Sequence, residues 1–346
     1  HPDRGSVIDP AKPLGTLGHF LRAKVDWLPV HAESDDWVRT LTELGRGGAD
    51  GKFGLGQLNA YAGQQVPGWP APGYPVNVLK FAPSLLGYDW STYGYFADPG
   101  PYPDWQQMAT QQGWDEYCFV VGPDGTTWEL IGVDRGFWGW VSSWFGKRRA
   151  AGGVVWDPAY TPRLVGGLPV GAGAAAMPIS PMVLRKAELD AGHIDHPLYL
   201  GRGGRTRGGD PRKGDGYIWP ARGHDASTTT VDLTAPPYGS WYRLRADFQL
   251  PPLVPPAGLT SQQIQTLVAG HQQAQIVADT LKKHGMIHGD GSSRPTHGLA
   301  AESTISQATF DALHKVPLSA FEAVDTTALR LKPAASIGSP DYWACR

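Results

Sequence analysis

Residues 188–200 read Glu-Leu-Asp-Ala-Gly-His-Ile-Asp-His-Pro-Leu-Tyr-Leu, and this stretch joins the end of a predicted helix to a predicted strand. The helix covers residues 183–190, and Gly192 marks its end because glycine adopts the left-handed conformation without a Cβ clash. The strand covers residues 194–200. Side chains alternate between the faces of a strand, so Asp195 and Tyr199 share one face, and the other carries Ile194, His196, Leu198 and Leu200. An acid and a ring opposite an apolar face predict the floor of a polar cleft.

The rest of the chain favours short strands and turns, since it contains 45 Gly and 31 Pro. The clearest hairpin joins residues 116–121 to residues 126–133 through Gly122-Pro-Asp-Gly125, because Asp-Gly is a favoured hairpin turn. Further strands are expected at residues 76–81, 154–156 and 241–250. We therefore predict a mainly β fold, an antiparallel β-sandwich of jelly-roll type.

Two or three helices are expected at the periphery of this sandwich. Ser34 is placed to cap a helix that reaches Leu44, and Ser261 begins a long helix that ends near His284. A shorter helix begins near Ser306 and ends before Pro317. The predicted organisation is an N-terminal arm (1–33), a single β-sandwich domain with peripheral helices (34–330) and a C-terminal tail (331–346).

Composition limits the classes of partner. Charged residues make up 18% of the chain and the net charge is −2, so no basic field for nucleic-acid binding is expected. No apolar run reaches the length of about eighteen residues that spans a bilayer, and we expect no membrane association. The numbering from His1 suggests a processed, exported chain, and we expect a secreted, extracellular monomer. Cys118 and Cys345 either form one disulfide, which an oxidising exterior permits, or remain free thiols.

Aromatic residues are abundant, with 14 Trp and 13 Tyr. Such rings either pack in a core or line a cleft, where they stack on the apolar face of a sugar. The ring-rich segments 83–114 and 137–149 favour binding walls. We therefore expect a polysaccharide or oligosaccharide as partner, and the predicted binding residues are Trp90, Trp138, Trp140, Trp219, Tyr199 and Arg243.

Carboxylates in such a cleft indicate hydrolysis of a glycosidic bond, because that reaction uses one protonated and one ionised carboxyl group. We predict Asp195 and Glu129 as the catalytic pair of a glycoside hydrolase, with Glu116 and Asp134 as further candidates. Two other functions remain open. One is a polysaccharide lyase on an acidic glycan, with Tyr199 as base and an arginine neutralising the uronate. The other is a non-catalytic carbohydrate-binding or cell-wall-associated protein.

Histidine and aspartate also gather near the opening stretch, at His193, Asp195, His196, His224 and Asp225. Such a set suits a metal ion or a proton relay if the two segments are neighbours. Because His196 points away from His193 and Asp195 on a strand, we predict a buried, hydrogen-bonded His196 in place of a metal ligand. We expect no resident metal or cofactor, although a divalent cation such as calcium is compatible with the sequence.

Four motifs follow one another in the second half of the chain: Ala-Gly-X-Ile-Asp-His (191–196), Tyr-X-Trp-Pro-Ala (217–221), Leu-Lys-Lys-His-Gly-Met-Ile-X-Gly-Asp-Gly-Ser (281–292) and Val-Pro-X-Ser-Ala-Phe-Glu (316–322). This order resembles a group of exported bacterial β-sandwich proteins of unassigned function. The resemblance implies export and a β-sandwich, and it implies no reaction. The positions that carry it are Ile194, Asp195, His196, Tyr217, Trp219, Pro220, His284, Gly285, Asp290 and Ser292.

Overall fold

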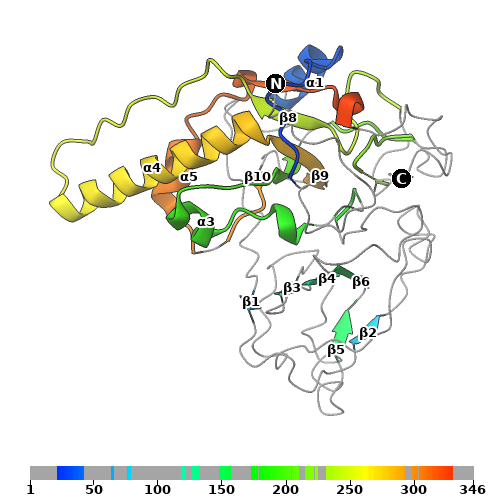
Figure 1. Cartoon of the computed structure of the whole chain (residues 1–346), viewed down its shortest axis with the longest axis horizontal. Coiled ribbons are helices and arrows are strands. Elements are labelled where there is room, and N and C mark those ends of the chain that lie inside the picture. Colours follow the sequence, from blue (N-terminus) through cyan, green and yellow to red (C-terminus); the bar gives the residue numbers. More distant parts are fainter. Residues whose placement is uncertain are drawn as a thin grey trace.

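The computed structural model describes residues 22–42, 173–175, 177, 179–203, 205–209, 215–221, 223–224, 231–292, 298–302 and 304–329, together with the backbone of six short strands between residues 64 and 156. Its largest sheet has five strands and is accompanied by a few helices (Figure 1). The strand order is β10 (Gly298–Leu299), β7 (Leu198–Gly203), β9 (Met286–Ser292), β8 (Trp241–Leu244) and β11 (Phe321–Ala323).

This sheet is mixed in direction. β7 and β9 are parallel and pair from Leu198 opposite Met286 to Gly203 opposite Ser292, while every other neighbouring pair in the sheet is antiparallel. Parallel neighbours need a long connection, and here the chain between them contains β8 and a long helix. The expected β-sheet with accompanying helices is confirmed, but the expected antiparallel arrangement is wrong for this sheet, because β7 and β9 run parallel.

The long helix, α4 (Ser261–Lys283), covers one face of the sheet. Its N-terminus is fixed by a capping box, in which the Thr260 hydroxyl accepts from the Gln263 amide and the Gln263 side chain accepts from the Thr260 amide. The apolar cluster on this face combines helix and strand residues: Ala274, Val277, Ala278, Leu281, Leu198, Leu200, Tyr242, Leu244 and Met286. Both α4 and the strand β8 confirm the sequence prediction of a long helix and of a strand within residues 241–250.

A shorter helix, α5 (Gln307–Leu313), packs against α4. The two cross at Gly270, where an added Cβ would lie 2.6 Å from Ala308. Ser306 caps α5 by accepting from the Thr309 amide at 3.4 Å. The prediction of a helix that begins near Ser306 is confirmed.

The opposite face of the sheet is buried as well, by a second apolar cluster that combines strand residues with loop residues: Tyr199, Trp241, Ile287, Met177, Met182, Trp219 and Tyr238. Tyr199 therefore does lie on the face opposite Leu198 and Leu200, as the alternation predicts. That face is part of the interior, because residues from distant loops cover it.

The segment that leads into β7 differs from the prediction in its strand boundary. α3 (Lys186–Ala191) ends at Gly192, which has a φ of 81°, as expected for a glycine C-cap. Residues 194–197 form a loop, and pairing begins only at Leu198, whose amide donates to Gly285 at 3.0 Å. Pro197 has no N–H to contribute to a ladder, which explains the later start. β8 also ends early, at Leu244, and residues 245–247 are exposed.

The N-terminal segment lies along the outer edge of β11. Val30 forms an antiparallel bridge with Val324, and the His31 amide donates to Ala323 at 2.8 Å. α1 (Ser34–Thr42) follows, and the Ser34 hydroxyl accepts from the Ala323 amide at 2.8 Å. The predicted capping role of Ser34 is thus replaced by a contact that occupies an unpaired amide of an edge strand.

The remaining elements are short. A four-stranded sheet has the order β1 (Gln64–Gln65), β3 (Cys118–Val121), β4 (Thr127–Ile131) and β6 (Gly152–Trp156), and its antiparallel β3–β4 pair confirms the predicted hairpin. β2 (Val76–Val78) pairs with β5 (Arg148–Ala150). Three 3-10 helices are η4 (Ser180–Met182), η6 (Leu318–Ala320) and η7 (Thr326–Leu329). Within the described ranges, no helix is long and apolar enough to cross a membrane.

Candidate functional site

Asp195 lies in the loop between α3 and β7, where its side chain is 49% exposed. Its Oδ1 is 3.6 Å from Nζ of Lys283, the last residue of α4. A cation in the last turn of a helix also interacts favourably with the helix dipole, so Lys283 is well placed to hold a carboxylate there. The predicted catalytic acid is therefore accessible from solvent and paired with a lysine.

His196 is buried directly beside this loop. Its Nδ1 is 2.8 Å from the Pro197 carbonyl, and its Nε2 is 3.1 Å from Oε1 of Glu188 on α3. Both ring nitrogens face acceptors, an arrangement that a doubly protonated ring satisfies. The prediction of a buried, hydrogen-bonded His196 is confirmed, and Glu188 is a second carboxylate near Asp195 that sequence spacing did not single out.

His284 is a further polar residue at the C-terminal end of α4, directly after Lys283. It is buried, and its Nδ1 lies 2.8 Å from the Ala23 carbonyl, so the ring holds the N-terminal segment in place. Burial lowers the pKa of His284 from 6.5 to about 4, with a smaller opposing effect from the hydrogen bond to Ala23. The ring is therefore neutral near neutral pH, and its Nε2 has no hydrogen-bond partner among the described residues.

Three of the predicted sugar-binding side chains lie inside the fold. Tyr199 is fully buried and donates from its hydroxyl to the Gly289 carbonyl at 2.6 Å. Trp219 is buried against Trp241, with ring centroids 6.4 Å apart. In these positions both rings contribute to core packing.

Arg243 is 12% exposed and connects three parts of the chain. Its Nε is 2.7 Å from Oε1 of Glu322, and its Nη1 donates to the carbonyls of Val25 and Leu28 at 2.6 and 2.8 Å. All of these contacts are internal, so Arg243 stabilises the join between β8, β11 and the N-terminal segment.

The other predicted residues cannot be located in the same detail. Glu129 lies on β4 opposite Phe119 and Val154, and its side chain is outside the described residues. The same holds for Trp90, Trp138 and Trp140, for Glu116, Asp134 and Asp225, and for Cys345. Cys118 is the first residue of β3.

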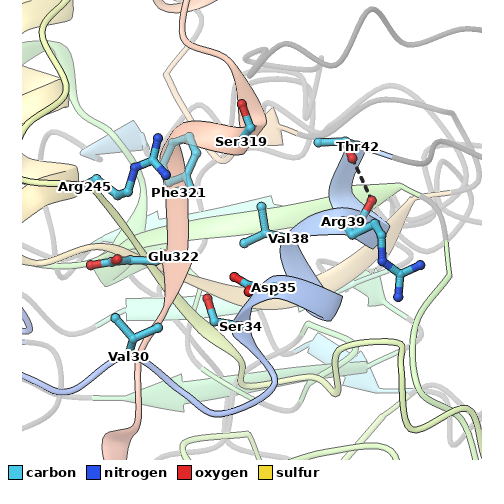
Figure 2. Close-up of a pocket in the computed structure, with 10 residues that line it drawn as sticks. All are labelled: Val30, Ser34, Asp35, Val38, Arg39, Thr42, Arg245, Ser319, Phe321 and Glu322. Carbon is cyan, nitrogen blue, oxygen red and sulfur yellow. Dashed lines mark hydrogen bonds between the residues drawn. The ribbon is translucent and has the colours of Figure 1, made fainter.

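A pocket of about 300 Å³ lies between α1 and β11, in a place that the sequence analysis did not predict (Figure 2). One face of α1 contributes residues at positions 34, 35, 38, 39 and 42, which recur at helical spacing. The lining combines hydroxyl groups, charged groups and apolar side chains: Ser34, Thr42, Ser319, Asp35, Arg39, Arg245, Glu322, Val30, Val38 and Phe321.

The charged groups of this pocket have different surroundings. Glu322 is held by Arg243, as described above. Arg245 is half-exposed and only 3.9 Å from Asp247, and Arg39 pairs with Asp36 on its own helix. Asp35 has no ion-pair or hydrogen-bond partner for its carboxylate among the described residues. Figure 2 shows Asp35 and Ser34 below Val38, with Arg245 and Phe321 across from them.

Sequence reasoning missed this pocket because its two walls are at opposite ends of the chain. The sequence contains two local features that point to these pocket walls. Asp35 and Arg39 are one helical turn apart, and Phe321 and Glu322 end the Val-Pro-X-Ser-Ala-Phe-Glu motif. The bridge between Val30 and Val324 and the hydrogen bonds of Ala323 with His31 and Ser34 bring the two segments together.

The pocket and Asp195 flank different strands of the five-stranded sheet. Leu198, Met286, Tyr242 and Ala323 lie opposite one another on successive strands. Three inter-strand spacings of about 4.8 Å separate the first strand from the last by about 14 Å. Asp195 lies before Leu198 and Glu322 before Ala323, at the same end of these parallel-running strands.

A stack of buried rings lies on the other side of the sheet. The Tyr238 ring centroid is 4.5 Å from that of His288 and 6.2 Å from that of His224, and the rings are nearly parallel. His193, by contrast, is exposed in the loop after α3. Where the structure is described, no three His, Cys, Asp or Glu side chains are grouped closely enough to hold a metal ion.

Comparison with known proteins adds no assignment: no family model, no curated protein and no solved structure matches this chain.

Proposed function

We propose that this protein is carbohydrate-active and that the pocket between α1 and β11 binds a sugar unit of a polysaccharide or oligosaccharide. The lining of the pocket is the observation that supports the proposal. A sugar has hydroxyl groups that both donate and accept, around a ring with apolar faces. The pocket offers carboxylates, guanidiniums and hydroxyls around Val38 and Phe321, and its volume is at the lower end of the range for small-molecule sites.

The reaction we propose is hydrolysis of a glycosidic bond by two carboxyl groups. Two pairs are candidates. The pair predicted from sequence is Asp195 with Glu129, of which Asp195 is accessible to a substrate. The pocket supplies a second pair, Asp35 and Glu322, from opposite ends of the chain. Since the strands next to Asp195 and Glu322 are three inter-strand spacings, about 14 Å, apart, we propose the two pairs as alternatives.

A non-catalytic carbohydrate-binding protein is the second candidate function. One observation favours it: Glu322 already accepts a 2.7 Å hydrogen bond from Arg243, and this ion pair joins two strands. A carboxylate engaged in this way contributes to binding and stability without needing to exchange a proton.

We also propose, from the sequence, that the protein is secreted and that its sheets form a β-sandwich of jelly-roll type. Jelly rolls include lectin domains, so this architecture suits the same function. The mixed sheet described above is the part of this proposal that has been observed.

The test is a screen of plant, fungal and bacterial-wall polysaccharides that measures binding and analyses the products. Hydrolysis should release new reducing ends, a lyase should release unsaturated products that absorb ultraviolet light, and a binder should release nothing. Binding should weaken at least about tenfold in Asp35→Asn, which removes a charged sugar contact. Asp36→Asn is the matched control, because Asp36 is on the same helical turn and does not line the pocket.

The double variant Asp195→Asn with Glu129→Gln then decides which pair acts. Loss of turnover with retained binding assigns the reaction to Asp195 and Glu129. Unchanged turnover in that variant, with loss in Asp35→Asn, assigns it to the pocket. If no glycan binds, or if both Asp35→Asn and Asp36→Asn bind like the wild type, the pocket is not the sugar site.

A further inference from the structure

The segment from Phe248 to Ala278 contains 31 residues and no Asp, Glu, Lys or Arg. This is unusual in a chain with 18% charged residues, and the segment is bounded by Asp247 and Asp279. It comprises the Pro-rich loop after β8 and the first three-quarters of α4. Exposed helices commonly carry many charged residues, so a neutral one needs a physical reason.

The first nine residues of α4 project beyond the packed body of the protein. The helix contributes its first buried residue at Gly270, where α5 crosses it. In Figure 1 this end of α4 and the loop that leads to it extend away from the sheet. Val254 is 78% exposed in the loop and Val268 is 39% exposed on the helix. We call residues 251–269 the neutral arm.

Residues 261–269 of the neutral arm are helical in spite of their exposure. The capping box of Thr260 and Gln263 fixes the first turn, and the helix continues without interruption to Lys283. Ile264, Leu267 and Val268 recur at three- and four-residue spacing, so they form one apolar stripe along the projecting part. A capped helix with an apolar stripe and a neutral surface has the composition of the centre of an interface, from which charged residues are depleted.

We propose that the neutral arm pairs with the neutral arm of a second copy of this chain. In a two-fold dimer each surface meets itself, so any charge on it faces a like charge. A surface without charges avoids this repulsion. A different protein partner is usually selected by opposite charges across the interface, and the neutral arm has none to offer. Two such helices packed antiparallel also place opposite ends of their dipoles together.

The arm is short, which limits the strength of the dimer. Nine helical residues span about 13 Å, and with the returning loop the contact area falls at the low end for specific interfaces. The pairing is therefore expected to be weak and dependent on concentration. This inference replaces the expectation of a monomer and is independent of the proposed sugar site.

The experiment is sedimentation velocity on the full chain, from micromolar to several hundred micromolar. The wild type should shift towards a dimer as concentration rises. Val268→Asp and Val254→Asp place charges on the arm, and each should raise the dimer dissociation constant at least about tenfold, because a charge at the centre of an interface loses its hydration. Val231→Asp is the matched control, since Val231 is 50% exposed outside the arm and should behave like the wild type.

Circular dichroism of each variant should show unchanged helix content, because Val254 and Val268 are exposed enough to accept a polar side chain. A wild type that remains monomeric over the whole range overturns the proposal. So does a dimer that Val231→Asp weakens as much as the two arm variants do.

Discussion

Arg243 on β8 and Glu322 on β11 form an ion pair in which Nε lies 2.7 Å from Oε1. The same guanidinium donates to the backbone of Val25 and Leu28. One largely buried arginine thus joins the edge strand, its neighbour and the N-terminal segment. The position that the sequence indicates as a sugar ligand thus makes three internal hydrogen bonds.

Replacing this arginine should destabilise the protein strongly. Arg243→Met keeps the aliphatic stem but leaves Glu322 and two carbonyls without their donor, so the free energy of unfolding should fall by about 3 kcal/mol. Arg243→Lys should lose less, because it keeps the charge without the fork of donors. Urea denaturation measures both. Arg245→Met is the control, since Arg245 is half-exposed and should change stability by less than about 0.5 kcal/mol. Equal effects at 243 and 245 would contradict this account.

His284 should make the protein less stable as the pH falls from 6.5 towards 4. Burial lowers its pKa to about 4 in the folded protein, against 6.5 for the unfolded chain. Between these values the unfolded state binds a proton that the folded state does not, so acid favours unfolding. The contribution of His284 to the free energy of unfolding is fully present above pH 6.5, and about 3 kcal/mol of it is lost by pH 4.

The variant His284→Asn separates this effect from other groups that titrate in the same range. Its amide nitrogen replaces the donor to the Ala23 carbonyl but does not titrate. His31 also has a pKa lowered by burial and contributes in the same direction in both proteins. The measurement is the difference between wild type and variant in urea denaturation at several pH values. A difference that does not change between pH 6.5 and 4 would show that His284 is not the group responsible.

The packing of the Tyr199 ring depends on the absence of a side chain at Gly289. A Cβ at position 289 would lie 2.1 Å from the Tyr199 ring, and the register between β7 and β9 shifts at this point. Gly289→Ala should therefore destabilise by about 3 kcal/mol. Tyr199→Phe should cost only about 1 kcal/mol, because the Gly289 carbonyl still accepts from the Ala175 amide at 2.9 Å. Thermal unfolding compares the two. If Tyr199→Phe weakened glycan binding while stability was unchanged, the buried position assigned to Tyr199 would be wrong.

The local features of the fold follow from sequence because each depends on residues that are close in the chain. Gly192 ends α3 through its own φ, Asp-Gly predicts the β3–β4 hairpin, and α4 begins at Ser261 as predicted, with Thr260 as its N-cap. Alternation also assigns Tyr199 correctly to the face opposite Leu198 and Leu200.

Which face is covered is not a local property. The face that carries Tyr199 is closed by Trp219, Tyr238 and Met182, residues that come from other parts of the chain. The spacing of residues within β7 does not show which face of the strand is covered. A ring on this strand is therefore equally compatible with a cleft wall and with the core. The pocket was missed for the same reason, since α1 and β11 are distant in the chain and are neighbours only in the folded structure.

Asp195 and Lys283 provide the sharpest test of the proposed catalytic residue, because their ion pair contributes little to the fold. Both side chains are close to half-exposed and the two atoms are 3.6 Å apart, so the pair should be worth less than about 1 kcal/mol. Asp195→Asn and Lys283→Gln should therefore unfold at nearly the same urea concentration as the wild type. If Asp195 acts as an acid or base, Asp195→Asn alone should reduce turnover of a glycan identified by the screen, by about 10²- to 10⁴-fold. Full turnover in this stable variant would show that Asp195 does not act in the reaction. An equal loss of turnover in Asp195→Asn and Lys283→Gln would show that Asp195 acts only by holding Lys283.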